Sequence, residues 1–102
     1  MNKITYEERK EIYEKALRTW GVLMQSIVAI EEQAELIKEI CKELRGRGNV
    51  YNMAEEAADV SIMLEQLRLM YDLDDAAELH MDRKIQRLKR GLGMVSETEG
   101  TT

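Results

Sequence analysis

Apolar residues recur along most of the chain at alternating steps of four and three, which is the spacing of one face of an α-helix. The clearest run lies between Trp20 and Leu44, and its apolar line consists of Leu23, Ile27, Ile30, Ala34, Ile37, Cys41 and Leu44. A second line has the same spacing and consists of Met53, Ala57, Val60, Leu64, Leu67 and Tyr71. We therefore expect two amphipathic helices with these lines in the core, where Cys41 is a packing residue.

Capping and turn signals bound the first two expected helices. Thr5-Tyr6-Glu7-Glu8 has the form of a capping box, so a helix should begin near Tyr6. Trp20-Gly21 should break or bend it. A second helix should then run over residues 21–45 and stop at Gly46-Arg47-Gly48-Asn49. The candidates for the inner face of the first helix are Ile12, Ala16 and Leu17.

Two more helices are expected in the rest of the chain. Asn52 is a plausible N-cap for a helix that starts at Met53 and fades near residues 71–73. Asp74 or a neighbour should cap the fourth helix, whose inner line would be Ala77, Met81, Ile85, Leu88 and Leu92. From Gly93 onward no periodicity remains, so residues 93–102 are expected to be a disordered tail after a single domain over residues 1–92.

Composition favours the all-α class, because proline is absent and many residues are of types that favour helices, including the charged residues that make up 34% of the chain. We expect an antiparallel bundle of about four helices. With 102 residues the chain builds only a modest core, and its apolar residues lie on more than one line, so a homodimer or homotetramer should complete a four-helix-bundle core. The net charge of −5 disfavours nucleic-acid binding. The single cysteine and the absence of a long apolar run point to a soluble, cytoplasmic protein without a membrane span.

Acidic residues interrupt the edges of both apolar lines. Glu31, Glu32 and Glu35 lie in the first long helix, and Glu56 and Asp59 lie in the next. Carboxylates at such an edge are costly to desolvate unless they are paired, protonated or bound to a cation. Together they offer oxygen ligands on two rigid elements, which suits Mg²⁺, with Mn²⁺ as a substitute. Solvated or interface acids explain the pattern equally well.

The register of the two acidic segments raises a difficulty. In a tight hairpin centred near residue 49, Glu35 would face Met63 rather than Glu56, a mismatch of roughly 10 Å along the axis. Either the connecting loop runs back along the bundle, or a partner subunit supplies the second pair of acids.

The last expected helix is basic, and His80, Lys84 and Arg87 share one of its faces. Lys84 and Arg87 would suit phosphate oxygens if that face lines the acidic cluster. A nucleic-acid patch is the weaker alternative, and His80 is more simply a surface residue. Two polar or aromatic residues of the long helix, Trp20 and Gln25, are weak candidates for contacts with a base.

These motifs in this order resemble the MazG-like all-α nucleoside triphosphate pyrophosphohydrolases. The resemblance covers about residues 20–90 and includes the wording Glu-Glu-Ala-Ala-Asp-Val at residues 55–60. It implies that Mg²⁺ is held by Glu32, Glu35, Glu56 and Asp59, with Glu31 as an accessory carboxylate and Lys84 and Arg87 as phosphate contacts. The family has asparagine in the place of Asp82, so the role of Asp82 stays open.

The resemblance implies hydrolysis of a nucleoside triphosphate between its α and β phosphates, which yields the monophosphate and pyrophosphate. We expect a carboxylate of the first motif, Glu31 or Glu32, to act as the base, and the clustered acids to titrate together with at least one raised pKa. Two alternatives remain open. One is a non-enzymatic helical interaction module, and the other is a related all-α pyrophosphatase acting on dUTP, dCTP or phosphoribosyl-ATP.

Overall fold

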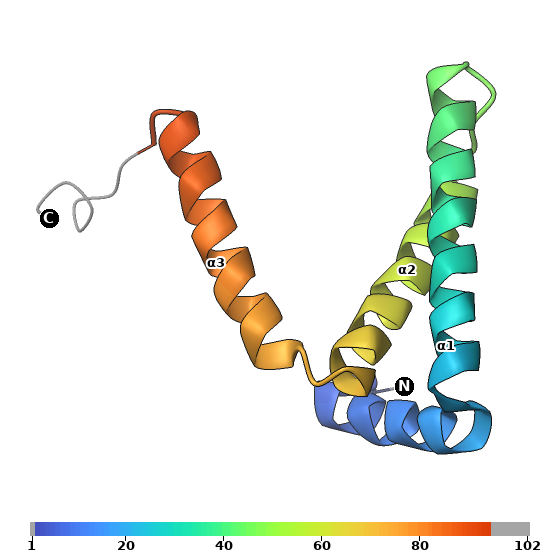
Figure 1. Cartoon of the computed structure of the whole chain (residues 1–102). Coiled ribbons are helices and arrows are strands. Elements are labelled where there is room, and N and C mark those ends of the chain that lie inside the picture. The colour runs from blue at the N-terminus through green and yellow to red at the C-terminus, as the bar shows by residue number, and fades with distance from the viewer. Residues whose placement is uncertain (1, 95–102) are drawn as a thin grey trace, which may run out of the picture. The chain divides into compact units, whose positions relative to one another are not determined.

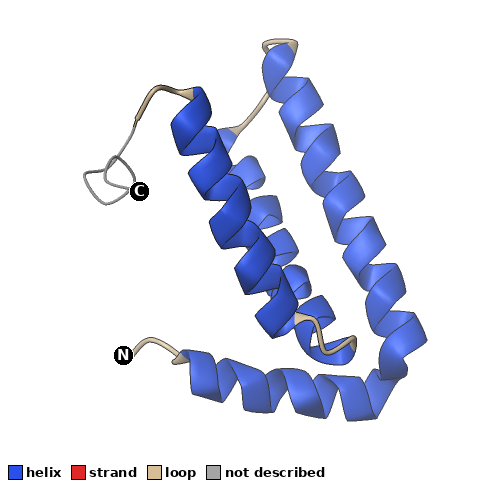
Figure 2. Cartoon of the chain, turned by 60° about the vertical axis from the view of Figure 1, so that its left-hand side comes forward, coloured by secondary structure: helices blue, strands red, loops and turns tan. Residues whose placement is uncertain are grey.

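The computed structural model describes residues 2–94, and every regular element among them is a helix (Figures 1 and 2). The helices are α1 (Tyr6–Leu44), α2 (Val50–Met70) and α3 (Asp74–Gly91). This confirms the all-α class. The contacts divide the chain after Asp72 into two units, so the α1–α2 unit and the α3 unit are described separately. Most of the expected tail, residues 95–102, lies outside the described residues.

The two helices expected before residue 45 form one helix with a sharp bend. Gly21 has φ +84° and ψ 165°, a conformation open to glycine alone, and α1 changes direction there (Figure 1). At the start of α1, Thr5 Oγ1 accepts a hydrogen bond from the Glu8 backbone N–H at 3.1 Å and donates one to the Glu8 carboxylate at 3.2 Å. The helix start at Tyr6 with Thr5 as its N-cap and the bend at Trp20-Gly21 are both confirmed, and the Glu8 carboxylate accepts from the Thr5 hydroxyl.

The loop between α1 and α2 folds back along the end of α1. The Arg47 N–H donates to the Lys42 carbonyl at 2.9 Å, and Gly48 lies so close to Glu43 that no Cβ would fit. The Asn49 side chain then caps α2 by accepting from the N–H groups of Tyr51 and Asn52. The cap is therefore Asn49 and not Asn52, because Asn52 already lies in the first turn of the helix.

The α1–α2 interface uses a different face of α1 from the one predicted. The buried residues of this unit are Tyr13, Gln25, Ala29, Glu39, Met63 and Gln66. The predicted apolar line of α1, which we call the outer stripe (Leu23, Ile27, Ile30, Ala34, Ile37, Cys41 and Leu44), is exposed throughout, up to 76% at Leu23 and 82% at Leu44. The prediction that this line forms the core, and that Cys41 packs there, is wrong for the single chain.

The predicted inner residues of the other segments are corrected in part. Of the line predicted for α2, Met53, Val60 and Leu67 are half-buried, whereas Ala57, Leu64 and Tyr71 are exposed; Met63, outside that line, is buried. On the first segment of α1, Tyr13 is buried, Ala16 and Leu17 are half-buried, and Ile12 is exposed. Periodicity identifies the apolar lines correctly, but in α1 an adjacent line faces the neighbour, and in α2 only every second position of the predicted line is half-buried.

Polar contacts fix the first segment of α1 to α2. Arg9 forms an ion pair with Glu65 at 3.1 Å, and the Tyr13 hydroxyl donates to the same carboxylate at 3.1 Å. At the other side of the bend, the Ser26 and Tyr71 hydroxyls share a hydrogen bond of 2.8 Å. These contacts hold α2 against both segments of α1.

The α3 unit is a single helix with Asp74 and Asp75 in its first turn and Lys89 and Arg90 in its last, an arrangement that favourably opposes the helix dipole. The N-cap is Leu73, a neighbour of Asp74 as the prediction allowed, and it makes no side-chain capping bond. No residue of α3 is buried, and only Ala77 of its predicted inner line is half-buried. None of the helices described in residues 2–94 has the length and apolar character of a membrane span.

Candidate metal centre

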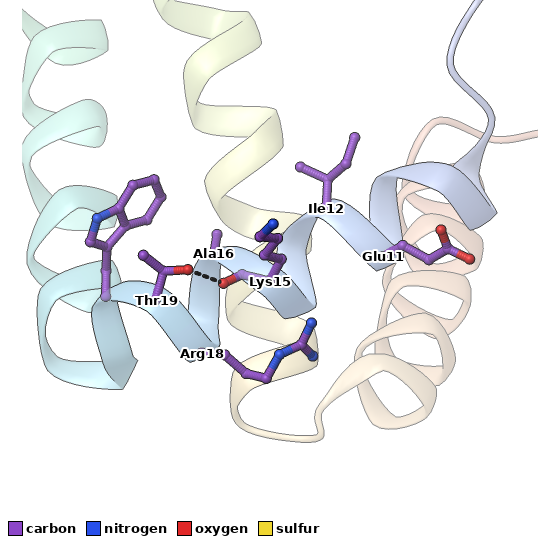
Figure 3. Close-up of a pocket in the computed structure, with 7 residues that line it drawn as sticks. Glu11, Ile12, Lys15, Ala16, Arg18 and Thr19 are labelled. Carbon is purple, nitrogen blue, oxygen red and sulfur yellow. Dashed lines mark hydrogen bonds between the residues drawn. The ribbon is translucent and has the colours of Figure 1, made fainter.

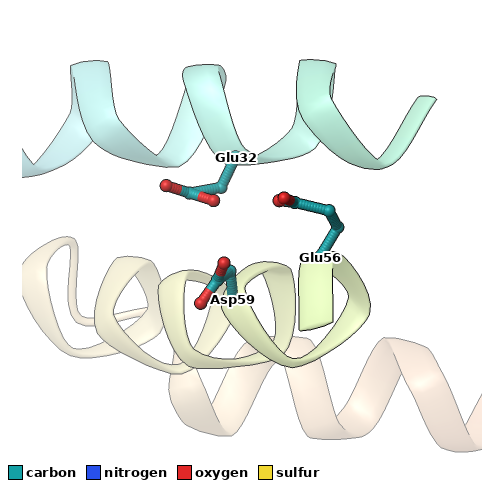
Figure 4. A group of neighbouring side chains, drawn as sticks. All are labelled: Glu32, Glu56 and Asp59. Carbon is teal, nitrogen blue, oxygen red and sulfur yellow. The ribbon is translucent and has the colours of Figure 1, made fainter. Parts of the chain in front are cut away.

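Three carboxylates converge between α1 and α2. Glu32 extends from α1 toward α2, Glu56 extends from α2 toward α1, and Asp59 lies one turn further along α2 (Figure 4). One oxygen from each residue lies within 4.8 Å of the others. Because the loop folds back along α1, Glu56 reaches the level of Glu32, which answers the register difficulty without a partner subunit.

The electrostatics of this acidic triad are unfavourable without a cation. The Glu56 Oε2 atom is buried and has no hydrogen-bond partner. The described ion pairs, Arg9–Glu65 and Lys42–Glu39, leave the triad out. Desolvation raises the pKa of Glu32, and the nearby charges of Asp59 and Glu56 raise it further. A raised pKa at one member of the acidic cluster is what clustering predicts.

The arrangement suits a hard divalent cation. Carboxylate oxygens from two packed helices lie within 4.8 Å of one another, and the buried Glu56 Oε2 accepts no hydrogen bond. A divalent cation would stabilise oxygens in such a position. The half-exposed character of the group, with Glu32 and Glu56 partly buried and Asp59 exposed, leaves room for water or substrate oxygens to complete the coordination of Mg²⁺.

The other predicted ligands of α1 are placed differently. Glu31 and Glu35 are both exposed and lie outside the triad. Glu35 follows Glu32 by one helical turn, so it flanks the triad rather than joining it. The triad thus contains three of the four acids predicted to bind the metal.

Sequence reasoning missed one buried acid on the face of α1 that carries Glu32. Glu39 is buried and accepts a hydrogen bond from Lys42 at 3.4 Å. Gln25, Glu32 and Glu39 follow one another at intervals of seven residues, so they share a face of α1. This polar repeat lies beside the apolar one along the sequence, and it indicates the face of α1 that contacts α2.

The two weak candidates for base contacts lie in different surroundings. Trp20 is 62% exposed and lines a hollow of about 640 Å³ on the first segment of α1, together with Ile12, Ala16 and Thr19 (Figure 3). Gln25 is only 5% exposed, because it faces α2, and it does not line that hollow. The structure therefore does not bring Trp20 and Gln25 together in one pocket.

The basic residues of α3 form a separate feature within their own unit. Lys84 and Arg87 line a hollow of about 370 Å³ with His80, Arg83 and Arg90. Asp82 accepts a hydrogen bond from Gln86 at 2.8 Å, so part of its acceptor capacity is used within the helix. This face of α3 can hold an anion by charge.

Comparison with protein-family models, with curated proteins and with solved structures finds no match to this chain. The fold and the site by themselves define an all-α protein with a carboxylate triad between two antiparallel helices.

Proposed function

We propose that this protein is a Mg²⁺-dependent nucleoside triphosphate pyrophosphohydrolase of the MazG-like kind, which cleaves between the α and β phosphates. The observation that carries the proposal is the triad of Glu32, Glu56 and Asp59, together with the buried Glu56 Oε2 that has no hydrogen-bond partner. The motif resemblance supports the choice of reaction, because the three residues are among the acids that the resemblance assigns to the metal.

In this proposal the triad binds the metal and the neighbouring acids flank it. Bound Mg²⁺ supplies charge neutralisation of the triphosphate and a lowered pKa for an attacking water. Glu31 or Glu32 accepts the proton of that water while its oxygen bonds to the α phosphorus. The bond from that phosphorus to the bridging oxygen breaks, and pyrophosphate leaves.

The basic face of α3 supports a phosphate-bearing substrate. Lys84 and Arg87 line one hollow of α3, and their cationic side chains suit contacts with phosphate oxygens. The exposed Trp20 is the better of the two candidates for stacking on a base, because Gln25 is buried.

The test is release of pyrophosphate from a panel of canonical and modified nucleoside triphosphates, with Mg²⁺ and with EDTA. The panel includes dUTP, dCTP and phosphoribosyl-ATP, so that it separates the general enzyme from the more specialised ones. We expect release that requires Mg²⁺ and is lost in Glu56→Gln and in Asp59→Asn. The matched control is Glu55→Gln, which changes the net charge equally at an exposed neighbour outside the triad.

A second pair of variants tests the base. We expect Glu31→Gln or Glu32→Gln to lower turnover strongly, and full turnover in both would exclude a base in the first motif.

A non-enzymatic interaction module is the second candidate, and the exposed outer stripe of α1 favours it. It predicts no pyrophosphate release from any member of the panel and the same stability in Mg²⁺ as in EDTA.

A further inference from the structure

The outer stripe of α1 is an apolar surface with the repeat of a coiled coil. Its seven positions alternate by four and three from Leu23 to Leu44, which averages one apolar residue every 3.5 positions. The run is three heptads, or about 32 Å, long. Contiguous apolar surface of this kind on a soluble protein marks an interaction site.

The stripe cannot turn inward in the α1–α2 unit, because the opposite face of the same helix is already occupied. Gln25, Ala29 and Glu39 are buried on that face. α1 therefore has its more polar side against α2 and its more aliphatic side in solvent. A rotation that exchanged the two sides would expose Ala29 and break up the triad around Glu32.

We infer that the outer stripe pairs with the same stripe of a second copy of this chain, in antiparallel orientation. The reason is the charge pattern along one edge of the stripe. Glu31 and Lys38 lie on this edge, seven residues apart, and both are exposed without an ion pair among the described contacts. In an antiparallel coiled coil this edge meets the same edge of the partner, running in the opposite direction.

One antiparallel register satisfies both the apolar and the charged positions. When Ala34 lies opposite the partner's Ile37, each of the six stripe positions from Ile27 to Leu44 faces an apolar position of the partner's stripe, and Leu23 lies beyond the paired stretch. The same register brings Glu31 next to the partner's Lys38, and the two-fold axis repeats the pair. A shift by one heptad in one direction would bring Glu31 next to the partner's Glu31. A shift in the other direction would bring the two copies of Lys38 together and leave fewer apolar positions paired, so charge and apolar pairing together select the first register.

A parallel pair lacks this complementarity. There the edge with Glu31 and Lys38 would meet the other edge of the partner's stripe, which carries Ser26, Gln33 and Ile40 and no charge. This inference is independent of the proposed enzymatic function, because it rests on the outer face of α1 and not on the triad.

Light scattering at micromolar concentration gives the first readout. We expect the mass of a dimer for the wild type and of a monomer for Ile37→Glu, with helical content retained by circular dichroism because Ile37 is exposed in the single chain. Ile12→Glu is the control, since it places the same charge at an exposed isoleucine of α1 away from the stripe. A monomeric wild type, whose stripe is then left bare or covered within the chain, would overturn the inference.

Charge exchange tests the orientation. Glu31→Lys should weaken the dimer by about fourfold to twenty-fivefold, since two exposed charge pairs are lost and such a pair is worth roughly twofold to fivefold in affinity. Adding Lys38→Glu should restore the affinity, because the pairs are then re-formed with their signs exchanged. No recovery in the double variant would contradict the antiparallel register.

The native cysteine supplies a readout that does not depend on affinity. In the proposed register Cys41 lies opposite the partner's Ile30 and about 16 Å from the partner's Cys41 along the axis. Mild oxidation should therefore cross-link Ile30→Cys into a disulfide-bonded dimer and leave the wild type uncross-linked. Rapid cross-linking of the wild type through Cys41 would show a parallel pair and refute the inference.

Discussion

Replacing Glu56 with glutamine removes one of three negative charges that the fold holds together. One oxygen of each acid in the triad lies within 4.8 Å of the others. At that distance two unit charges repel by about 0.9 kcal/mol in a water-like dielectric and by about 3.5 kcal/mol at an effective dielectric constant near 20. Because Asp59 is exposed and Glu32 and Glu56 are only partly buried, the lower figure is taken as a minimum. Glu56→Gln ends two such repulsions, so the apo protein should gain about 2 kcal/mol in free energy of unfolding.

The assay is urea unfolding followed by circular dichroism at neutral pH, low salt and fixed protein concentration. In EDTA we expect the midpoint of Glu56→Gln to lie about 1 M urea above that of the wild type. In Mg²⁺ at a hundredfold excess over its dissociation constant, the wild type should gain about 2.7 kcal/mol and the variant much less, so the order reverses. Glu55→Gln should stay within about 0.5 kcal/mol of the wild type under both conditions.

The pH dependence gives a further check on the same variant. The pKa of Glu32 is raised above its usual value of 4.5, so the folded wild type binds a proton that the unfolded chain releases. As the pH falls from neutral through this raised pKa, the wild type gains stability and the advantage of Glu56→Gln shrinks. If Glu56→Gln is no more stable than Glu55→Gln in EDTA, repulsion among the three carboxylates does not destabilise the fold, and the reasoning is refuted.

Three further predictions concern the scaffold of the site. Gly21→Ala should lower the free energy of unfolding by about 1–3 kcal/mol, because φ is +84° at this position. Gly91→Ala, in the last turn of α3, should not lower it, and chemical denaturation of the two variants compares them. Asn49→Ala should cost about 0.5–2 kcal/mol in the same assay, because the two N–H groups at the start of α2 lose their acceptor. Burial and the bond to Glu65 raise the pKa of Tyr13 above 10.0, so stability should fall as the pH rises past 10. Tyr13→Phe should show a smaller loss between pH 9 and pH 11, and an equal loss in both proteins would contradict this assignment.

The boundaries of the helices were largely predictable because they depend on residues that are close in sequence. The capping box at Thr5 and the bend at Gly21 were identified from two to four adjacent residues. The cap of α2 was placed three residues late, because both Asn49 and Asn52 have the chemistry and only the path of the loop selects between them. Local chemistry therefore identified the elements, and tertiary contacts decided their ends.

All three residues of the triad were among the acids predicted to bind the metal, but the sequence could not exclude a fourth acid that lies outside the triad. Spacing pointed to Glu32, Glu56 and Asp59, but it pointed equally to Glu35, which lies outside. The difference comes from the connection, since the loop that packs Gly48 against Glu43 sets how far α2 is shifted along α1. No pattern within either helix encodes that shift.

The face that α1 turns toward α2 was mispredicted for a reason that connects the site to the assembly. The most apolar line of a helix was assumed to face its own hairpin, but the hairpin buries only Tyr13, Ala29 and Met63 as apolar residues among those described. So small a core, with a repelling triad beside it, contributes little toward the 5–15 kcal/mol that folded proteins typically have. In our two proposals the missing stabilisation would come from outside the hairpin, from a cation in the triad and from a second chain on the outer stripe. Each binds only the folded state, so stability should rise with Mg²⁺ and with protein concentration. Glu56→Gln should remove the first dependence and leave the second, whereas Ile37→Glu should do the reverse.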